Sequence, residues 1–378
     1  MSINPDPYIT LIETLSHPDL KVRKAAIKAL SQLGDCRAIP TLLYLLDAKE
    51  TPIRIEAMRA LGKLKDARAI EPLIRILQTD SSGMAFCVPA VLARFSDPRV
   101  PSTLIQALNS PDIVVRQYAA QACGRLREPR AVPGLIAIIE EMSDCGSSFD
   151  PERDSGLRNP YWAAMDALGK IKDPQAIPVL IRALDDGFFI WGTSPWNYET
   201  HCGAIARKLA PFGDAAIPFL LEALENESVL VRTGAVMALK NLKYWTIVPT
   251  VIKILQDKDR LIIAEAVDFL GQSGDPQAMQ VLIERIDKTP NGTVPQVPLL
   301  LNVEAGRAAL LEYIQNGRAS DNARLYIAIG HWMVMGKQDD RFVSVLQDGL
   351  TSEIESIRKA AADALSRLPR TKNLRRYR

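Results

Sequence analysis

The sequence predicts an all-α fold: a right-handed α-solenoid of stacked antiparallel helical hairpins, about 31 residues each. Two observations predict it, a turn that recurs at constant spacing and apolar residues at helical intervals on both sides of that turn. The turn begins with an acid, and its first four copies start at Asp35, Asp66, Asp97 and Glu128, 31 residues apart. A fixed period of this length is typical of repeat proteins, in which each hairpin buries its apolar face against the next.

Further copies of the turn follow at wider spacing along the chain. They begin at Asp173, Asp214, Asp275 and Asp339. The last two gaps each hold two periods, and a degenerate copy around Tyr244 to Pro249 fills the first of them. The repeat therefore extends over most of the sequence.

The predicted first helix of each hairpin carries a second landmark, Val-Arg or Ile-Arg followed by an alanine-rich run. Within the first of these runs Ala26, Leu30 and Leu33 fall at helical spacing. Alanine lets paired helices approach closely, and we expect each Arg to bond to the turn of a neighbouring repeat, which would form a ladder along the stack. The landmark recurs at Arg23, Arg54, Arg116, Arg232 and Arg358.

The turn itself has the chemistry of a helix start. Its acid suits an N-cap, because a carboxylate accepts hydrogen bonds from the free amides of the second helix. Proline suits the beginning of that helix, where no amide hydrogen is needed. These prolines are Pro40, Pro133, Pro178, Pro218 and Pro249.

Together these motifs resemble the HEAT repeat, in particular the short phycobilisome-lyase HEAT-like repeat. That pattern runs from an acid through Val-Arg, Ala-Ala, Ala-Leu-Gly and Leu-Gly-Asp to Ala-Ile-Pro and Leu. The match covers most of the chain and is strongest over 17–140 and 160–285. The resemblance implies an α-solenoid; such repeats occur in scaffolds, chaperone-like factors and a few enzymes.

Composition narrows the class of protein further. The net charge of +2 argues against an overall electrostatic attraction to nucleic acid or to anionic membranes. The five cysteines are scattered and form no C-x-x-C pair, which favours reduced thiols. No signal peptide or membrane-spanning run is visible at the sequence level. We therefore expect a soluble cytoplasmic protein with no membrane contact.

The predicted organisation is one solenoid with three enlarged loops and a tail. The solenoid runs over 1–366, the loops lie at 140–160, 186–201 and 287–298, and a basic tail occupies 367–378. Departures from a repeat mark the places where function is most often found, because insertions map to loops on one edge of the stack. The first two loops interrupt adjacent repeats and are expected side by side on one rim.

These two loops have an unusual composition. Eight of the 23 aromatic residues lie between Phe149 and Tyr198, and the repeated Arg is replaced by Tyr161 and Cys202. One interpretation is that the aromatic side chains fill the gap left by a long loop. The other is a recognition surface, since aromatic residues beside Arg are enriched in interface hot spots. Its candidate partner- or ligand-binding residues are Arg153, Arg158, Tyr161, Trp162, Arg182, Phe188, Trp191, Trp196 and Tyr198.

Three kinds of chemistry find no support in the sequence. The histidines His17, His201 and His331 lie in different repeats, so no metal site is predicted. There is no Gly-rich phosphate loop. Exposed positions nine residues after each turn carry only two cations, Arg75 and Arg182, too few to follow a phosphate backbone, so nucleic-acid binding is not expected.

The first functional hypothesis is a non-catalytic binding module or assembly factor that needs no cofactor. It would recognise another protein through its concave face and the aromatic rim, and the partner could be a phycobiliprotein subunit or a second HEAT-repeat chain.

The alternative, which follows from the family resemblance, is a bilin lyase or bilin chaperone that delivers an open-chain tetrapyrrole to a phycobiliprotein cysteine. The aromatic residues would form its walls and the three arginines of the candidate set would meet the propionates. Its catalytic candidates are His201 as proton donor, Cys202 as transient acceptor or small packing residue, and Asp154, or Asp150, as the partner of the pyrroles.

Overall fold

The fold is built only from helices in the part of the chain that is described. The computed structural model describes residues 6–79, 84–144, 160–186, 201–287, 301, 304–315, 329 and 340–367. These residues form α-helices and short 3₁₀ turns and no β-strand, which confirms the predicted all-α solenoid of stacked hairpins. The chain divides into two compact units, Met1–Phe219 and Leu220–Arg378, and the division falls inside helix α13 (Ile217–Ala223).

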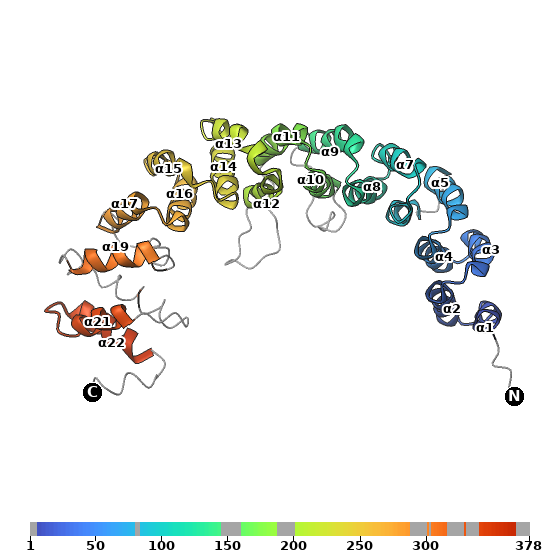
Figure 1. The fold of residues 1–378 in the computed structure, drawn as a ribbon, viewed down its shortest axis with the longest axis horizontal. Helices are drawn as coiled ribbons and strands as arrows, with labels where there is room; N and C mark the ends of the chain where they lie inside the picture. Colours follow the sequence, from blue (N-terminus) through green and yellow to red (C-terminus); the bar gives the residue numbers. More distant parts are fainter. Residues whose placement is uncertain are drawn as a thin grey trace. The chain divides into compact units, whose positions relative to one another are not determined.

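Each hairpin of the first unit contributes one helix to each of two rows (Figure 1). The first helices form the inner row of this unit in that view, and the second helices form the outer row. The inner row holds α2 (Leu20–Leu33), α4 (Thr51–Leu64), the turn η4 (Ala85–Cys87) with α6 (Val88–Leu92), α8 (Ile113–Leu126), α10 (Pro160–Ile171) and α12 (His201–Leu209). The outer row holds α1 (Pro7–Thr14), α3 (Ile39–Tyr44), α5 (Ile70–Thr79), α7 (Arg99–Ala107), α9 (Val132–Asp144) and α11 (Ile177–Arg182).

The second unit repeats the same kind of helix along its own length. Its described helices after α13 are α14 (Val229–Asn241), α15 (Val248–Ile254), α16 (Arg260–Ser273), α17 (Pro276–Asp287), α19 (Glu304–Gln315), α21 (Asp340–Gly349) and α22 (Glu355–Arg367).

Most of each predicted loop and of the predicted tail lies outside the described residues. Where the bounds can be compared, the predicted loop at 140–160 begins too early, because α9 continues to Asp144. Apolar residues at helical spacing, Leu135, Ile138 and Ile139, are buried and hold this helix against its neighbours. Likewise the loop predicted to end at 201 stops earlier, since His201 already belongs to α12.

The turn acid caps a short 3₁₀ helix that leads into the second helix, rather than the second helix itself. Asp35 Oδ1 accepts a hydrogen bond from the Arg37 backbone amide at 2.9 Å, and Asp66 Oδ1 accepts one from Arg68 at 3.0 Å. The same arginines fold their guanidinium groups back onto these carboxylates. Pro40 stands in the first turn of α3, as predicted.

The residue before the turn acid ends the first helix with a left-handed conformation in most repeats. Gly34 adopts it at φ 74° and Gly274 at φ 66°, which suits a residue without Cβ. Other repeats place a basic residue there, at some conformational cost. These residues are Lys65 (φ 56°), Arg127 (φ 52°) and Lys172 (φ 64°), and Lys243 (φ 55°) precedes Tyr244 of the degenerate turn in the same way.

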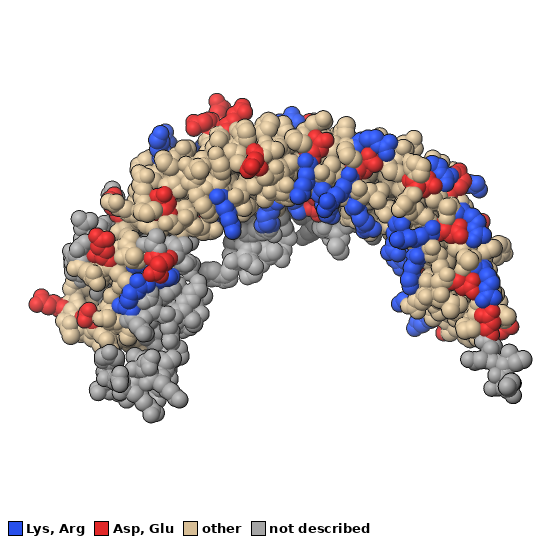
Figure 2. Space-filling view, in the orientation of Figure 1, with Lys and Arg blue, Asp and Glu red and all other residues tan. Residues whose placement is uncertain are grey.

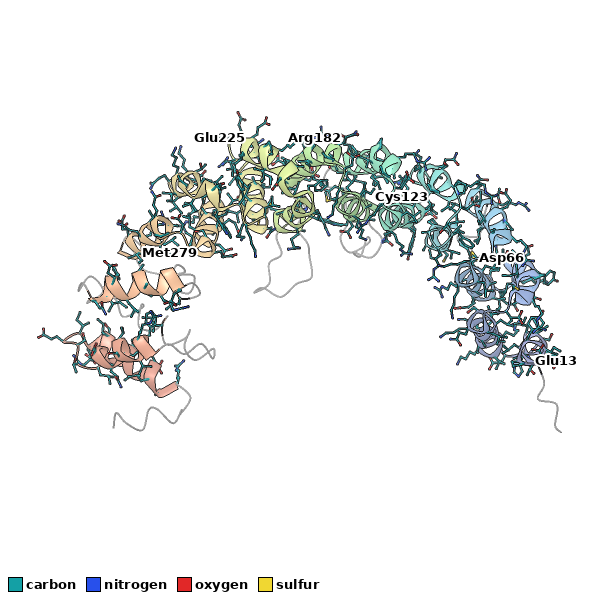
Figure 3. All side chains as sticks on the ribbon, viewed as in Figure 1. Glu13, Asp66, Cys123, Arg182, Glu225 and Met279 are labelled. Carbon is teal, nitrogen blue, oxygen red and sulfur yellow. The ribbon has the colours of Figure 1, made fainter. Side chains whose placement is uncertain are left out.

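The core of the first unit lies between the two rows (Figure 3). Ile27 and Leu30 of α2 and Leu42 of α3 are fully buried there. Small residues set the spacing along the inner row, since a Cβ added to Gly124 of α8 would lie 2.6 Å from the Cα of Ala167 in α10. The two helices therefore approach closely, as alanine enrichment predicts.

The predicted bond from a ladder arginine to the turn of the neighbouring repeat is present at Arg23 and Arg232. Arg23 Nη2 bonds to Glu50 Oε1 at 2.9 Å, and Glu50 lies in the turn before the next first helix. Arg232 makes the same contact to Asp257 at 3.1 Å and also donates to the carbonyl of Asn226 at 2.9 Å, just before its own helix. Arg232 thus joins the turns at the start of two consecutive first helices. Arg116 donates to the Ser110 carbonyl before its own helix and pairs with Glu141 of α9 at 3.6 Å. Arg54 donates to the Leu46 carbonyl and Arg358 to the carbonyls of Ser352 and Glu353, which lie in the segments before their own helices.

Candidate protein-binding face

Tyr161 takes over the ladder position that Arg occupies in other repeats. It is 2 % exposed, and its hydroxyl donates to Asp186 Oδ2 at 2.6 Å. The Ser143 hydroxyl bonds to the same oxygen at 2.6 Å. Burial and the neighbouring carboxylate raise the pKa of Tyr161, so the phenol stays protonated. The acid of the ladder is retained and only its donor has changed.

The other predicted residues at the start of α10 and α12 form a packed cluster. His201 is 4 % exposed, and its Nε2 lies 2.8 Å from the Ala183 carbonyl oxygen. Trp162 packs edge-on against it, with ring centroids 5.4 Å apart. Burial lowers the pKa of His201 and favours the neutral ring. Cys202 is 3 % exposed, with Sγ 3.8 Å from the Leu184 carbonyl oxygen.

The remaining predicted residues are separated from this cluster or are not described. Arg182 lies on the outer row, where Figure 3 labels it, and pairs with Glu140. It is exposed there and does not join the buried aromatic cluster. The predicted residues outside the described part of the chain are Asp150, Arg153, Asp154, Arg158, Phe188, Trp191, Trp196 and Tyr198.

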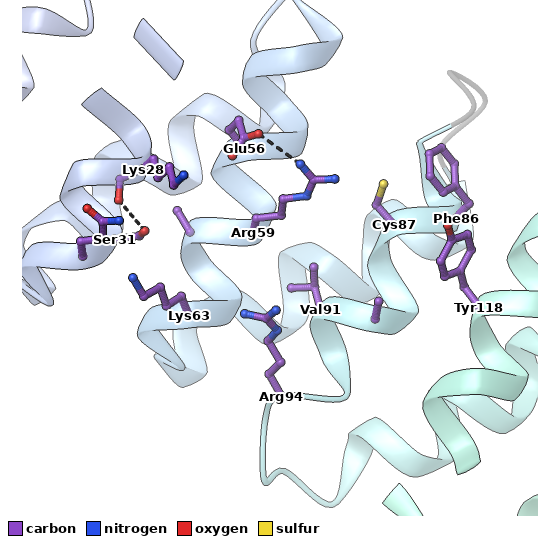
Figure 4. A pocket seen from close by; sticks show the side chains of 13 residues that line it. Lys28, Ser31, Glu56, Arg59, Lys63, Phe86, Cys87, Val91, Arg94 and Tyr118 are labelled. Carbon is purple, nitrogen blue, oxygen red and sulfur yellow. Dashed lines mark hydrogen bonds and ion pairs between the residues drawn. The ribbon is translucent and has the colours of Figure 1, made fainter. Parts of the chain in front are cut away.

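A groove of about 480 Å³ opens on the inner row of the first unit, between α2, α4, α6 and α8 (Figure 4). Its basic lining comes from three helical repeats. Lys28 stands on α2, Arg59 and Lys63 on α4, and Arg94 directly after α6. All four side chains belong to exposed residues.

One carboxylate accompanies these four cations in the groove. Glu56 Oε1 lies 3.1 Å from Arg59 Nη1, an exposed pair of small energetic value. Lys28, Lys63 and Arg94 make no ion pair with any described residue. The groove therefore carries an excess of positive charge that its own carboxylate leaves largely unneutralised.

Apolar and aromatic side chains form the rest of the lining. Phe86 and Tyr118 stand together at one end, with ring centroids 5.7 Å apart, and Val91 lies between them and the cations (Figure 4). Cys87 is half-buried beside them, and burial raises the pKa of its thiol while the nearby Arg59 opposes the shift. A mixed basic and apolar hollow of this kind suits an acidic segment with apolar side chains.

The positive charge continues beyond the groove along the inner row of this unit. One cation stands three residues before the turn acid in each of four successive repeats. They are exposed, and none forms an ion pair with a described residue. Figure 2 shows Lys and Arg gathered along this edge. We call these residues the basic row: Lys63, Arg94, Arg125 and Lys170.

Sequence reasoning missed the basic row because it tested another register. The positions that it examined for cations, nine residues after each turn, belong to second helices and hence to the outer row of this unit, as Arg75 on α5 shows. Helical periodicity separates a buried face from an exposed one but does not say which row lines the inner side. A comparison of every exposed register across the repeats would have found the row.

The described part of the chain contains neither a candidate metal site nor a candidate membrane-spanning helix. No group of three or more His, Cys, Asp or Glu side chains gathers there as a metal site would require. No helix among the same residues is long and apolar enough to cross a bilayer.

The repeated hairpins, the arginine ladder and the exposed inner row define an α-solenoid of the kind that presents a long surface to a partner. Family models agree: HEAT repeats match over 9–85, 88–144 and 204–297, and the PBS lyase HEAT-like repeat matches over 160–186. The chain belongs to the HEAT-repeat family. No curated protein matches the sequence closely enough to count as a relative.

Solved structures share the fold at low sequence identity. A mutant of the karyopherin Kap121p matches with a TM-score of 0.59 and 13 % identity, covering 96 % of this chain and 45 % of that one. Kap95p in its complex with RanGDP matches with 0.57 and 12 %, covering 95 % and 56 %. This chain therefore spans only about half the length of these karyopherins. The CpcE–CpcF phycocyanin lyase complex of Nostoc sp. PCC7120 gives 0.24 and 21 %, covering 81 % and 87 %.

Proposed function

We propose that the protein is a non-catalytic binding module that holds a partner protein against the inner row of its first unit. The observation that carries this proposal is the groove between α2 and α8, where three cations without an ion pair among the described residues surround an apolar hollow. An acidic partner would be drawn to this surface by complementary charge and held by burial of apolar side chains.

Other features of the chain support a binding role over a catalytic one. Two of the catalytic candidates, His201 and Cys202, belong to the described residues. Each is less than 5 % exposed and bonds to a backbone carbonyl of the preceding repeat. Their contacts are those of packing residues at the start of a helix. Kap95p, which shares the fold, binds RanGDP, and a binding role suits the long stacked surface of this chain.

The test compares two charge reversals on opposite rows. Arg94→Glu changes the groove, whereas Arg75→Glu changes a residue of α5 on the outer row that is also exposed, and neither arginine pairs with a described acid. The tagged full chain is recovered from the cells that naturally make it, and co-purifying proteins are quantified by mass spectrometry. We expect a discrete partner whose recovery falls about fivefold or more with Arg94→Glu and is unchanged with Arg75→Glu. Equal losses from both variants would contradict the proposal.

The bilin-handling role remains as the second candidate, because 160–186 matches the phycobilisome-lyase HEAT-like repeat and the aromatic cluster of Tyr161, Trp162 and His201 lies in and after that segment. Production of the full chain together with a bilin pathway tests it directly. A bound bilin would give visible absorbance and red fluorescence that Trp191→Ala or Trp196→Ala diminishes. A colourless protein under the same conditions removes this candidate.

A further inference from the structure

The geometry of the basic row points to a particular shape of partner segment. We propose that the row binds an extended acidic segment of the partner in the polyproline II conformation, with an acidic residue at about every third position. This inference rests on the proposed function and adds to it the conformation and the residue spacing of the bound segment.

The spacing of the cations follows from the packing of the helices that carry them. Four segments carry the cations and pack side by side in chain order: α4, α6, α8 and α10. Lys63, Arg125 and Lys170 stand on α4, α8 and α10, and Arg94 follows α6 directly. Packed helices have axes about 8–10 Å apart. Because each cation occupies the same register of its repeat, the row presents one positive charge at about that interval. Gly124 against Ala167 shows how close this approach is between α8 and α10.

An extended segment in the polyproline II conformation matches this interval in two ways. It rises about 3.1 Å per residue, so three residues cover about 9 Å. It also has three residues per turn, so every third side chain lies on the same face. A β-strand has a similar rise per residue, but two of its residues three positions apart point to opposite faces. Acids at every third position of a polyproline II segment can therefore meet successive cations of the row.

The same observations favour a peptide over a nucleic acid. A DNA duplex carries one negative charge per about 1.7 Å of its axis, far denser than one cation per repeat. The groove at the start of the row also contains the Glu56 carboxylate and the apolar Val91, with Ala60 and Ala90 beside them. The Glu56 carboxylate would repel a phosphate backbone, and the apolar side chains would contribute nothing to its binding. A protein segment, in contrast, can place its intervening side chains against these apolar residues.

The test uses synthetic fluorescein-labelled peptides and the full chain. Each peptide carries four Asp residues, with Ser and Pro at the other positions, and the Asp residues stand at every second, third or fourth position. Fluorescence anisotropy at low salt measures Kd, and a single-stranded oligonucleotide with four phosphates serves as the competing class of ligand. We expect the peptide with Asp at every third position to bind about fivefold or more tightly than the other two.

A second readout locates the bound peptide. Cys87 lines the groove and Cys36 is exposed outside it, so the peptide should slow alkylation of the Cys87 thiol and leave that of Cys36 unchanged. Arg94→Gln should weaken binding of the peptide, and Arg75→Gln on the outer row should leave its Kd unchanged.

Each other outcome overturns the inference in a recognisable way. Equal affinity for all three spacings would reject the register while leaving an acidic partner in place. Tighter binding of the oligonucleotide would reject a peptide in favour of nucleic acid, and no binding of any peptide would reject the acidic segment. The proposed function is judged separately, by recovery of the natural partner with Arg94→Glu and Arg75→Glu.

Discussion

The contact between α8 and α10 gives a quantitative prediction for Gly124→Ala. The added Cβ would lie 2.6 Å from the Cα and 2.8 Å from the Cβ of Ala167, so one helix must move away from the other. Overpacking of this kind costs about 1–3 kcal/mol, and contact with backbone places it near the upper end. Alanine returns about 1 kcal/mol through its helix propensity. The net loss in the free energy of unfolding is about 2 kcal/mol, or about 4–8 °C in the Tm of a unit of this size.

Gly169 provides the matched control, because it holds the same position in the next repeat. Its added Cβ would meet only the Lys208 carbonyl oxygen at 3.5 Å, an ordinary contact. Gly169→Ala should therefore raise the Tm by about 2–4 °C through helix propensity alone. Thermal unfolding followed by circular dichroism measures both variants. If Gly124→Ala is as stable as Gly169→Ala, the close approach of α8 and α10 is wrong.

Three further predictions concern the turns and the ladder. Tyr161→Phe removes the donor to Asp186 and should lower the free energy of unfolding by about 1–2 kcal/mol in urea denaturation; an unchanged midpoint would show that the bond contributes nothing. Lys65→Gly relieves a left-handed φ of 56° and should raise the free energy of unfolding by roughly 0.5–1 kcal/mol, and the Tm with it; a lower Tm would mean that the contacts of the Lys65 side chain contribute more than its backbone strain costs. The Arg68 guanidinium lowers the pKa of Asp66 to about 2, so the stabilisation by this pair should be complete above about pH 4 and lost as the pH falls through about 2. Thermal unfolding from pH 7 to pH 2 should show a smaller acid-induced decrease for Asp66→Asn than for the natural chain; identical profiles would contradict this reasoning.

The fold could be predicted because each of its devices is local and repeated. The acid of the turn, exemplified by Asp66, is followed at fixed spacing by Arg68 and by the start of the second helix, so every copy reinforces the same interpretation. The ladder was predictable for the same reason, since Arg232 and its equivalents recur at one register.

The candidate site was harder to predict, because it depends on contacts between repeats. The sequence shows that Tyr161 replaces an arginine, but the retained bond to Asp186 requires pairing across 25 residues. That spacing is the one between Arg232 and Asp257, which offers a signal in hindsight. The basic row was not predicted for another reason. The side of the stack on which Arg94 lies depends on how the hairpins pack, and the sequence analysis compared only one exposed register across the repeats.

Photo-crosslinking from opposite rows of one repeat tests the central claim most directly. Gln32 of α2 lines the groove, whereas Tyr44 at the end of α3 is 78 % exposed on the outer row. Each is replaced in turn by p-benzoylphenylalanine in the full chain, which is irradiated in the cells that naturally make it. We predict a discrete protein adduct from position 32 that Arg94→Glu abolishes, and none from position 44. An equal or stronger adduct from position 44 would contradict the assignment of the inner row as the binding face.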